Sequence, residues 1–171
     1  DAPKLHDAID VDEHCVWSVA FSGVSRVLAS GGTDGNVRLW DLTAEKPKQR
    51  AKLRVHPGGS VGLGIPVWVK VAFSHDGQTL ASSSIGEVVR LWDFSTGKSK
   101  ARGRIKSEIS ACFSSDDKSL VTSDGWSVKV WDINGRKPRK RATWHGHGHP
   151  TLSPFQRPVL SATFASDGKT V

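Results

Sequence analysis

Short stretches of alternating residues recur along the chain and predict β-strands. In Val37-Arg38-Leu39-Trp40-Asp41, Val37 and Leu39 point to one face of an extended strand, and Arg38 and Trp40 point to the other. Large side chains on both faces are typical of a strand that is covered on both sides. The same pattern returns at 89–93 (Val-Arg-Leu-Trp-Asp) and at 128–132 (Val-Lys-Val-Trp-Asp). The chain is therefore built from internal repeats.

A second apolar block precedes each of these stretches, and turn residues separate the blocks. Val19-Ala20-Phe21-Ser22 has counterparts at 71–74, 111–114 and 162–165. Asp-Gly pairs follow two of them and favour tight hairpin turns, because glycine tolerates positive φ. A strand of small residues comes next, and a strand rich in Lys and Arg follows each Trp-Asp pair. Each unit thus predicts four antiparallel strands in roughly forty residues.

These units resemble the repeats of the WD-repeat β-propeller family over nearly all of residues 14–171, because three Trp-Asp endings stand in register with three Val-Ala-Phe-Ser-like starts. The resemblance implies an all-β fold, a partial β-propeller of four-stranded antiparallel WD-repeat blades. We expect a lead-in at 1–13, blade 1 at 14–56, a long loop and blade 2 at 57–106, blade 3 at 107–147, and a long loop with the start of blade 4 at 148–171.

Blades of this family often carry a hydrogen-bonded set: the third-strand Trp, a second-strand Ser or Thr, a turn Asp, and a His before the first strand. No unit here has the full set in register. The His position of the first unit falls near Asp12, and that of the third falls near Lys106 or Arg104. In the second unit, Ile85 or Gly86 stands where the Asp is needed. We therefore expect blades that are less rigid than the best examples of the family. The structural residues that match the repeat are Trp40, Asp41, Ser30 and Asp34 in the first unit, Trp92, Asp93, Ser82 and His56 in the second, and Trp131 and Asp132 in the third.

Length and composition suit one β domain that is part of a larger protein. The chain has 171 residues, no Met, and no signal peptide or long hydrophobic run that would predict a membrane span. Three blades and part of a fourth make about half of a typical ring. The remaining blades of the same protein, or a second copy, are expected to close it, because open blade edges invite association. Cys15 and Cys112 are expected to be buried free thiols in a reducing compartment, the cytoplasm.

Two long insertions separate fourth strands from first strands, at 57–66 and 148–158. By family resemblance they lie on the face of the ring that usually receives partners, and long loops on a rigid scaffold often carry binding sites. Aromatic residues near this face are candidates for anchoring a protein or peptide, since Trp is enriched at binding hot spots. Packing of these rings under the neighbouring loop is the alternative. The candidate partner-binding residues are Trp17, Trp68, Lys70, Trp126 and His14.

The net charge of +7 is concentrated in the predicted fourth strands, which hold 15 of the 24 basic residues and none of the 17 acidic ones. Edge strands are commonly protected by Lys and Arg, which requires no ligand. A cationic rim could also bind nucleic acid or another anionic polymer. The residues that would do so are Lys48, Arg50, Lys52, Arg54, Lys100, Arg102, Arg104, Arg139 and Arg141.

Catalysis has no positive signal in the sequence. His145, His147 and His149 alternate with glycine, but in an extended strand such residues lie roughly 6.6 Å apart, which is wide for one ion. No phosphate loop or nucleophile elbow is present. We therefore expect a non-catalytic interaction scaffold with no cofactor and no metal. It would bind protein or peptide partners through its loop-bearing face; the alternative is a binder of nucleic acid through the basic outer strands.

Overall fold

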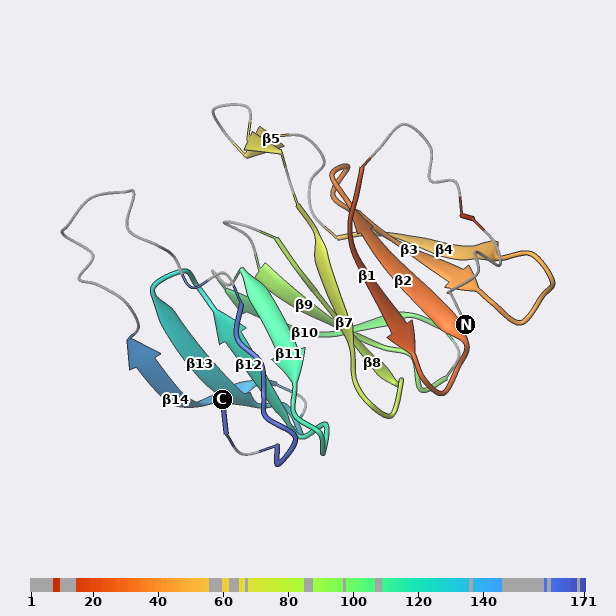
Figure 1. Cartoon of the computed structure of the whole chain (residues 1–171). Coiled ribbons are helices and arrows are strands. Elements are labelled where there is room, and N and C mark those ends of the chain that lie inside the picture. Colours follow the sequence, from red (N-terminus) through yellow and green to blue (C-terminus); the bar gives the residue numbers. More distant parts are fainter. Residues whose placement is uncertain are drawn as a thin grey trace, which may run out of the picture.

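The computed structural model describes residues 8–9, 15–55, 60–61, 65–66, 68–84, 88–96, 98–106, 109–135, 137–145, 159, 161–168 and 170–171. Three four-stranded antiparallel sheets stand side by side in chain order (Figure 1). Blade 1 contains β1 (Val16–Ser22), β2 (Val27–Gly32), β3 (Asn36–Asp41) and β4 (Lys48–Arg54). Blade 2 contains β7 (Lys70–Phe73), β8 (Thr79–Ser83), β9 (Val88–Asp93) and β10 (Lys100–Lys106). Blade 3 contains β11 (Ser110–Phe113), β12 (Ser119–Ser123), β13 (Ser127–Asp132) and β14 (Arg139–His145).

The expected all-β architecture of partial-propeller blades is confirmed. In each sheet the strands are paired in sequence order, so the fourth strand of each blade forms an outer edge. A two-stranded hairpin, β5 (Ser60–Val61) with β6 (Ile65–Pro66), lies in the connection between blades 1 and 2. No helix long and apolar enough to cross a membrane occurs among the described residues.

The antiparallel order gives each blade two ends. The starts of the first strands, the turns between second and third strands, and the connections between blades lie at one end, which we call the upper end. It is uppermost in Figure 1, where β5 projects from it. The turns between first and second strands and between third and fourth strands lie at the opposite, lower end. The connections between blades therefore all lie at the upper end, together with the turns between second and third strands.

Two hydrophobic clusters fill the spaces between blades. The first joins Val37 and Leu39 of blade 1 to Val71 and Leu80 of blade 2. The second joins further residues of blade 2 to blade 3, through Val89, Leu91, Phe113 and Leu120, each of which is buried. Burial of one such side chain contributes about 1.5–3 kcal/mol, so the blades are held together mainly by apolar packing. In β3 the residues from Val37 to Trp40 are all buried, so this strand is covered on both faces, as its sequence predicts. In β9, Arg90 and Trp92 stay half-buried.

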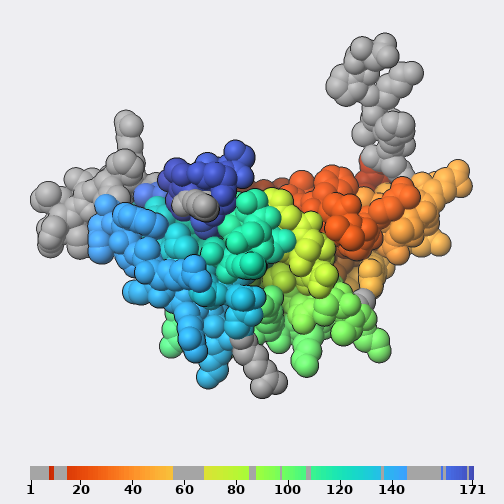
Figure 2. All heavy atoms as spheres, turned by 90° about the horizontal axis from the view of Figure 1, so that it is seen from below, coloured from red at the N-terminus to blue at the C-terminus, as the bar shows by residue number. Residues whose placement is uncertain are grey.

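Residues 161–168 run alongside blade 3 without forming a strand. Viewed from below, this stretch lies against blade 3 at the end of the row of blades (Figure 2). The Val159 amide donates to the Gly125 carbonyl over 2.8 Å, and the side chains of Cys112 and Thr163 are 3.4 Å apart. The fourth repeat thus begins in contact with the third.

Candidate functional site

The upper end carries a pair of stacked indole rings that bridges two blades. Trp17 lies on β1 and Trp68 lies just before β7, and their ring centroids are 4.6 Å apart with an interplanar angle of 12°. The Ser18 hydroxyl beside them accepts a 3.2 Å hydrogen bond from the Val71 amide, which fixes β1 against β7. Trp17 is nevertheless 49% exposed, so the stack presents an aromatic surface to solvent.

Two further predicted partner-binding residues lie at the same end. Lys70 begins β7, and partial burial lowers the pKa of its amino group. Trp126 lies in the turn between β12 and β13 of blade 3 and is 38% exposed; its amide donates to Asp124 over 2.9 Å. The structure therefore brings Trp17 and Trp68 into contact and puts Lys70 and Trp126 at the same end. His14, the loop 148–158 and residues 57–59 and 62–64 of the other loop lie outside the described residues.

The tryptophans of the Trp-Asp pairs are turned inward and serve the fold. Each indole N–H donates to the hydroxyl of the second-strand Ser or Thr: Trp40 to Ser30 over 2.9 Å, Trp92 to Ser82 over 3.1 Å, and Trp131 to Thr122 over 2.8 Å. Because a partly or fully buried indole N–H needs an acceptor, these bonds lock the second strand to the third. His56, which the family resemblance adds to this set, lies outside the described residues.

The aspartates of the Trp-Asp pairs also have local structural partners. The carboxylates of Asp41, Asp93 and Asp132 accept from the backbone amides two residues further on, over 2.9, 2.8 and 3.0 Å. These are the side-chain-to-backbone bonds that stabilise turns. Hydrogen bonds from Thr43, Ser95 and Arg141, respectively, lower the pKa of the three carboxyl groups. None of these acids has the perturbation expected of a proton donor in catalysis.

Blades 1 and 3 each contain a paired acid in the turn that leads into the third strand. Asp34 lies 2.9 Å from the Arg38 guanidinium, and both side chains are almost completely buried. Burial alone would raise the pKa of Asp34, but hydrogen bonds from Arg38 and Asn36 outweigh it and lower the pKa to about 2. In blade 3, Asp124 lies 2.7 Å from Lys129, and this bond, with others from the turn, holds the pKa of Asp124 far below its usual range despite burial.

The basic outer strands are exposed over most of their length. On β4, Lys48, Lys52 and Arg54 are exposed, and the alternate residues Ala51 and Leu53 are half-buried. On β10, Lys100 and Arg104 are exposed, as is Arg139 on β14. This pattern agrees with both interpretations of the sequence, since protection of an edge and attraction of an anion both need exposed charge.

A bulge interrupts each outer strand and redirects one arginine. The register between third and fourth strands shifts at Arg50, Arg102 and Arg141, each ten residues after its Trp. The Arg102 guanidinium spans two blades, because it donates to the Ile133 carbonyl of blade 3 over 2.6 Å and to the Thr79 hydroxyl over 3.1 Å. Arg141 is paired with Asp132. The constant spacing of ten residues from the Trp marks the position of the bulge in the sequence. The alternation of basic residues along the predicted fourth strands gave no sign of it.

The expectation that both thiols are buried is wrong. Both cysteines are free, but Cys15 is exposed and Cys112 is half-buried. Cys15 precedes β1, which has no further described blade packed on its open side, and Cys112 faces the extended stretch that contains Thr163. Exposure follows from the neighbours of a strand, which an alternating pattern does not specify.

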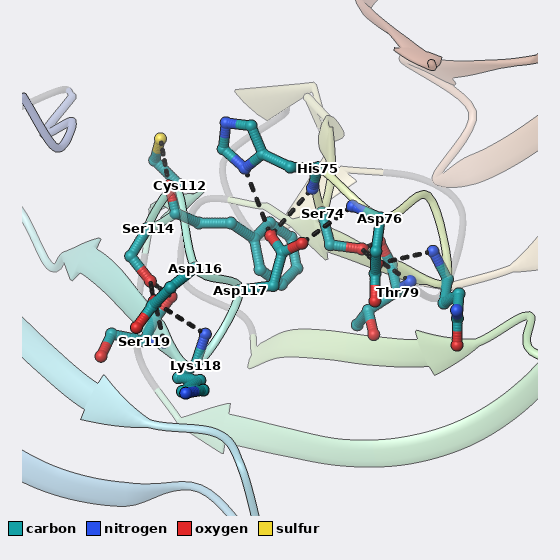
Figure 3. Close-up of polar contacts among 12 residues, drawn as sticks. Ser74, His75, Asp76, Thr79, Cys112, Ser114, Asp116, Asp117, Lys118 and Ser119 are labelled. Atoms are coloured by element: carbon teal, nitrogen blue, oxygen red, sulfur yellow. Dashed lines mark hydrogen bonds and ion pairs between the residues drawn. The ribbon is translucent and has the colours of Figure 1, made fainter. Parts of the chain in front are cut away.

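A latch at the lower end joins blades 2 and 3 and was not apparent from the sequence. Asp117 accepts from the backbone amides of His75 and Asp76, each over 2.8 Å, and lies 3.2 Å from the His75 ring (Figure 3). Its φ of 56° falls in the left-handed region, where the equivalent turn positions have Gly77 and Gly168. The Asp-Asp-Lys sequence in place of Asp-Gly was the available signal. Each of the two turns also has an internal Ser–Asp bond, from Ser74 to Asp76 and from Ser114 to Asp116.

The structure provides no ligand set for a metal among its described residues, where no group of three His, Cys, Asp or Glu converges. Of the alternating histidines only His145 is described, at the end of β14. The described part of the chain therefore offers two surfaces for function, the aromatic upper end and the basic outer strands.

Comparison with known proteins agrees with this architecture. The family profile "WD domain, G-beta repeat" matches residues 8–41, 51–93 and 100–132. A WD repeat-containing protein SL1-17 from Schistosoma mansoni is 31% identical over 133 residues, which cover 76% of this chain and 40% of that protein. The small ribosomal subunit protein RACK1 of Drosophila melanogaster is 29% identical, over 95% of this chain and 49% of its own length. The crystal structure of Saccharomyces cerevisiae Sqt1 superimposes with a TM-score of 0.66 at 15% identity, covering 86% of this chain and 38% of Sqt1. The chain thus spans less than half the length of each of these proteins.

Proposed function

Because the chain belongs to the WD-repeat family, whose members generally serve as protein-interaction scaffolds, we propose that it is a non-catalytic platform that binds protein or peptide partners through its upper end. The observation that carries this proposal is the Trp17–Trp68 stack, an aromatic pair that bridges two blades and stays half-exposed. Of the similar proteins, only RACK1 is named for an assembly, the small ribosomal subunit, so the partner of this chain has to be found by experiment.

The stack suits a binding anchor for two physical reasons. Trp offers a large apolar surface with few rotatable bonds, so it loses little conformational entropy when a partner covers it. The ring of Trp17 is already held against Trp68, and the bond between Ser18 and Val71 fixes the backbone beneath it. Such preorganisation favours affinity, because less ordering remains to be done on binding. Lys70 and Trp126 extend the surface with a cation and a third indole.

The test begins with cross-linking of the protein in cell extract to identify a partner, followed by affinity measurements with purified components. We expect Trp17→Ala and Trp68→Ala each to weaken binding by about tenfold or more, in line with loss of a hot-spot residue. Phe21→Ala is the matched control, because Phe21 is an aromatic residue that is 67% exposed but lies at the lower end of β1. Light scattering on each variant checks that its mass is unchanged. If only Phe21→Ala weakens binding, the upper end is not the site.

The exposed basic residues of β4 favour a second candidate function, the binding of an anionic polymer such as nucleic acid. Lys48, Arg50, Lys52 and Arg54 are all exposed and occupy every second position of the sequence along an edge that no other described strand covers. Binding by this surface would fall steeply with salt, since each phosphate neutralised releases a counterion. Titration with single-stranded RNA at low and high salt distinguishes the two functions. Negligible affinity at low salt would leave edge protection as the role of these residues.

A further inference from the structure

The third strand of every blade has a basic residue two positions before its Trp, and among the described residues two of the three have an acidic partner. Arg38 of blade 1 pairs with Asp34, and Lys129 of blade 3 pairs with Asp124. Both acids come from the turn between the second and third strands. The repeat therefore includes a built-in counter-charge at this point, and blade 2 departs from it.

In blade 2 the equivalent cation, Arg90, has no acid beside it among the described residues. Counted from the second strand, Ser84 takes the place of Asp124, since each lies two residues after the hydroxyl that binds the Trp. Within the described part of the chain, Arg90 Nε and Ser84 Oγ are the buried side-chain polar atoms with no hydrogen-bond partner. Buried polar groups without partners are costly, so each of them requires an explanation.

Register places the two groups on the same face of the blade. Ser82 pairs with Arg90 across β8 and β9, and Ser84 follows Ser82 by two residues. Blade 1 shows what fills this space when an acid is present. A Cβ on Gly32, which has the offset of Ser84, would lie only 2.9 Å from an Asp34 carboxylate oxygen and 3.7 Å from Arg38 Nη1. Blade 2 has a hydroxyl at this position and no described carboxylate.

A second guanidinium stands opposite the first. Arg104 on β10 is the direct cross-strand partner of Arg90. In blade 1 the corresponding residue, Lys52, lies 4.0 Å from the Asp34 carboxylate, which balances both cations. Like charges directly opposite each other repel, so the arginine pair of blade 2 is destabilising unless an anion joins it. Arg90, Trp92, Arg102 and Arg104 line a hollow of about 320 Å³.

We propose that blade 2 binds an oxyanion, a carboxylate or a phosphate group, between Arg90 and Arg104, in the place that the Asp34 carboxylate takes in blade 1. A guanidinium presents a planar fork of donors that matches two oxygens of either group. The Ser84 hydroxyl supplies one more donor. The site is separate from the Trp17–Trp68 stack, so it stands whether or not the upper end binds a protein.

The test is a titration of the intact chain with inorganic phosphate and, separately, with acetate, at constant ionic strength and against a sodium chloride baseline. NMR follows the Arg90 Nε–H signal and the Trp92 indole N–H signal, because both residues line the hollow. We expect saturable shifts with at least one anion. Shifts with phosphate alone support a phosphate-bearing ligand, and shifts with acetate support a carboxylate. Arg90→Gln and Arg104→Gln should each weaken binding by about tenfold or more.

Three further variants make the test specific to this site. Lys140→Gln removes the same single charge from the exposed outer strand of blade 3 and should leave the titration unchanged. Ser84→Asp installs an acid where blade 3 has Asp124, and it should abolish anion binding while raising Tm. Glu87→Gln removes one of the two carboxylates that lie three residues from Arg90 in the sequence, and binding should be unchanged or tighter. The other carboxylate, Asp93, accepts from the Ser95 amide. No saturable shift with either anion, equal loss in Lys140→Gln and Arg90→Gln, or binding that appears only in Glu87→Gln would each overturn the proposal.

Discussion

Blades 1 and 2 share the sequence Val-Arg-Leu-Trp-Asp in their third strands, yet the two copies have different surroundings. Inside each sheet the hydrogen bonding of the Trp is the same, since both indole N–H groups donate to a second-strand serine. The first strands differ: Val19 is 57% exposed, whereas its counterpart Val71 is 9% exposed, because blade 1 packs against Val71. The arginines differ as well, since Arg38 has an acid and Arg90 has none among the described residues. A repeat thus specifies its own sheet, while its neighbours and its turns decide exposure and charge balance.

The largest expected effect on the free energy of unfolding tests whether packing against a neighbouring blade sets the contribution of a first-strand Phe. Phe113 on β11 is 3% exposed and Phe21, at the same position of β1, is 67% exposed. Phe113→Ala should cost about 3–5 kcal/mol of unfolding free energy through lost burial and a cavity. Phe21→Ala should cost less than about 1 kcal/mol, as is usual for surface positions. Urea unfolding of both variants measures the difference, and similar losses would show that the repeat position alone sets stability.

The paired acid of blade 1 gives the next largest effect. Asp34→Asn leaves the Arg38 guanidinium buried without its counter-charge, and loss of one partner from a buried pair costs about 3 kcal/mol or more. Glu45→Gln, which removes the same charge from an exposed turn, serves as the control. Thermal or urea unfolding of the two variants makes the comparison. A loss in Asp34→Asn no larger than that in Glu45→Gln would contradict the role of the pair.

A fall in pH should remove the contribution of the Asp34–Arg38 pair to the stability of the intact chain. The folded-state pKa of Asp34 is about 2, below its ordinary value of 3.8, so its contribution to stability is complete above pH about 4. It should be lost as the pH falls from about 4 towards about 2, because the unfolded chain then binds a proton that the folded chain excludes. The gap in unfolding free energy between the wild type and Asp34→Asn should narrow over this range. A constant gap from pH 5 to pH 2 would argue against the pair as its source.

The smallest expected effect concerns the latch at the lower end. Asp117→Asn keeps a residue that tolerates left-handed φ but weakens two charge-assisted bonds to backbone amides, so a loss of about 1 kcal/mol is expected. Hydrogen exchange should accelerate at the amides of His75 and Asp76 and stay unchanged at the upper end. Unchanged exchange at these two amides would show that Asp117 does not hold the turns of blades 2 and 3 together.

Much of the fold follows from sequence because its causes are local. Alternation predicted the strands, Asp-Gly and Gly residues predicted the turns, and the Trp-Asp period predicted how many strands each blade has. The Trp17–Trp68 contact was beyond reach, since it depends on how β1 and β7 meet across two blades. The exposure of Cys15 depends likewise on what lies beside β1. The sequence has Ile85 or Gly86 where the repeat needs an Asp, but the consequence became visible only with the buried Arg90 Nε, which has no hydrogen-bond partner, and with the facing Arg104.

The central claim, that the upper end receives a protein partner, is tested most directly by hydrogen–deuterium exchange of the protein with and without its cross-linked partner. We expect new protection at residues 16–19 and 68–71, around the stacked rings, with β4, β10 and β14 unchanged. Protection confined to those outer strands, with the segments around Trp17 and Trp68 unaffected, would contradict it.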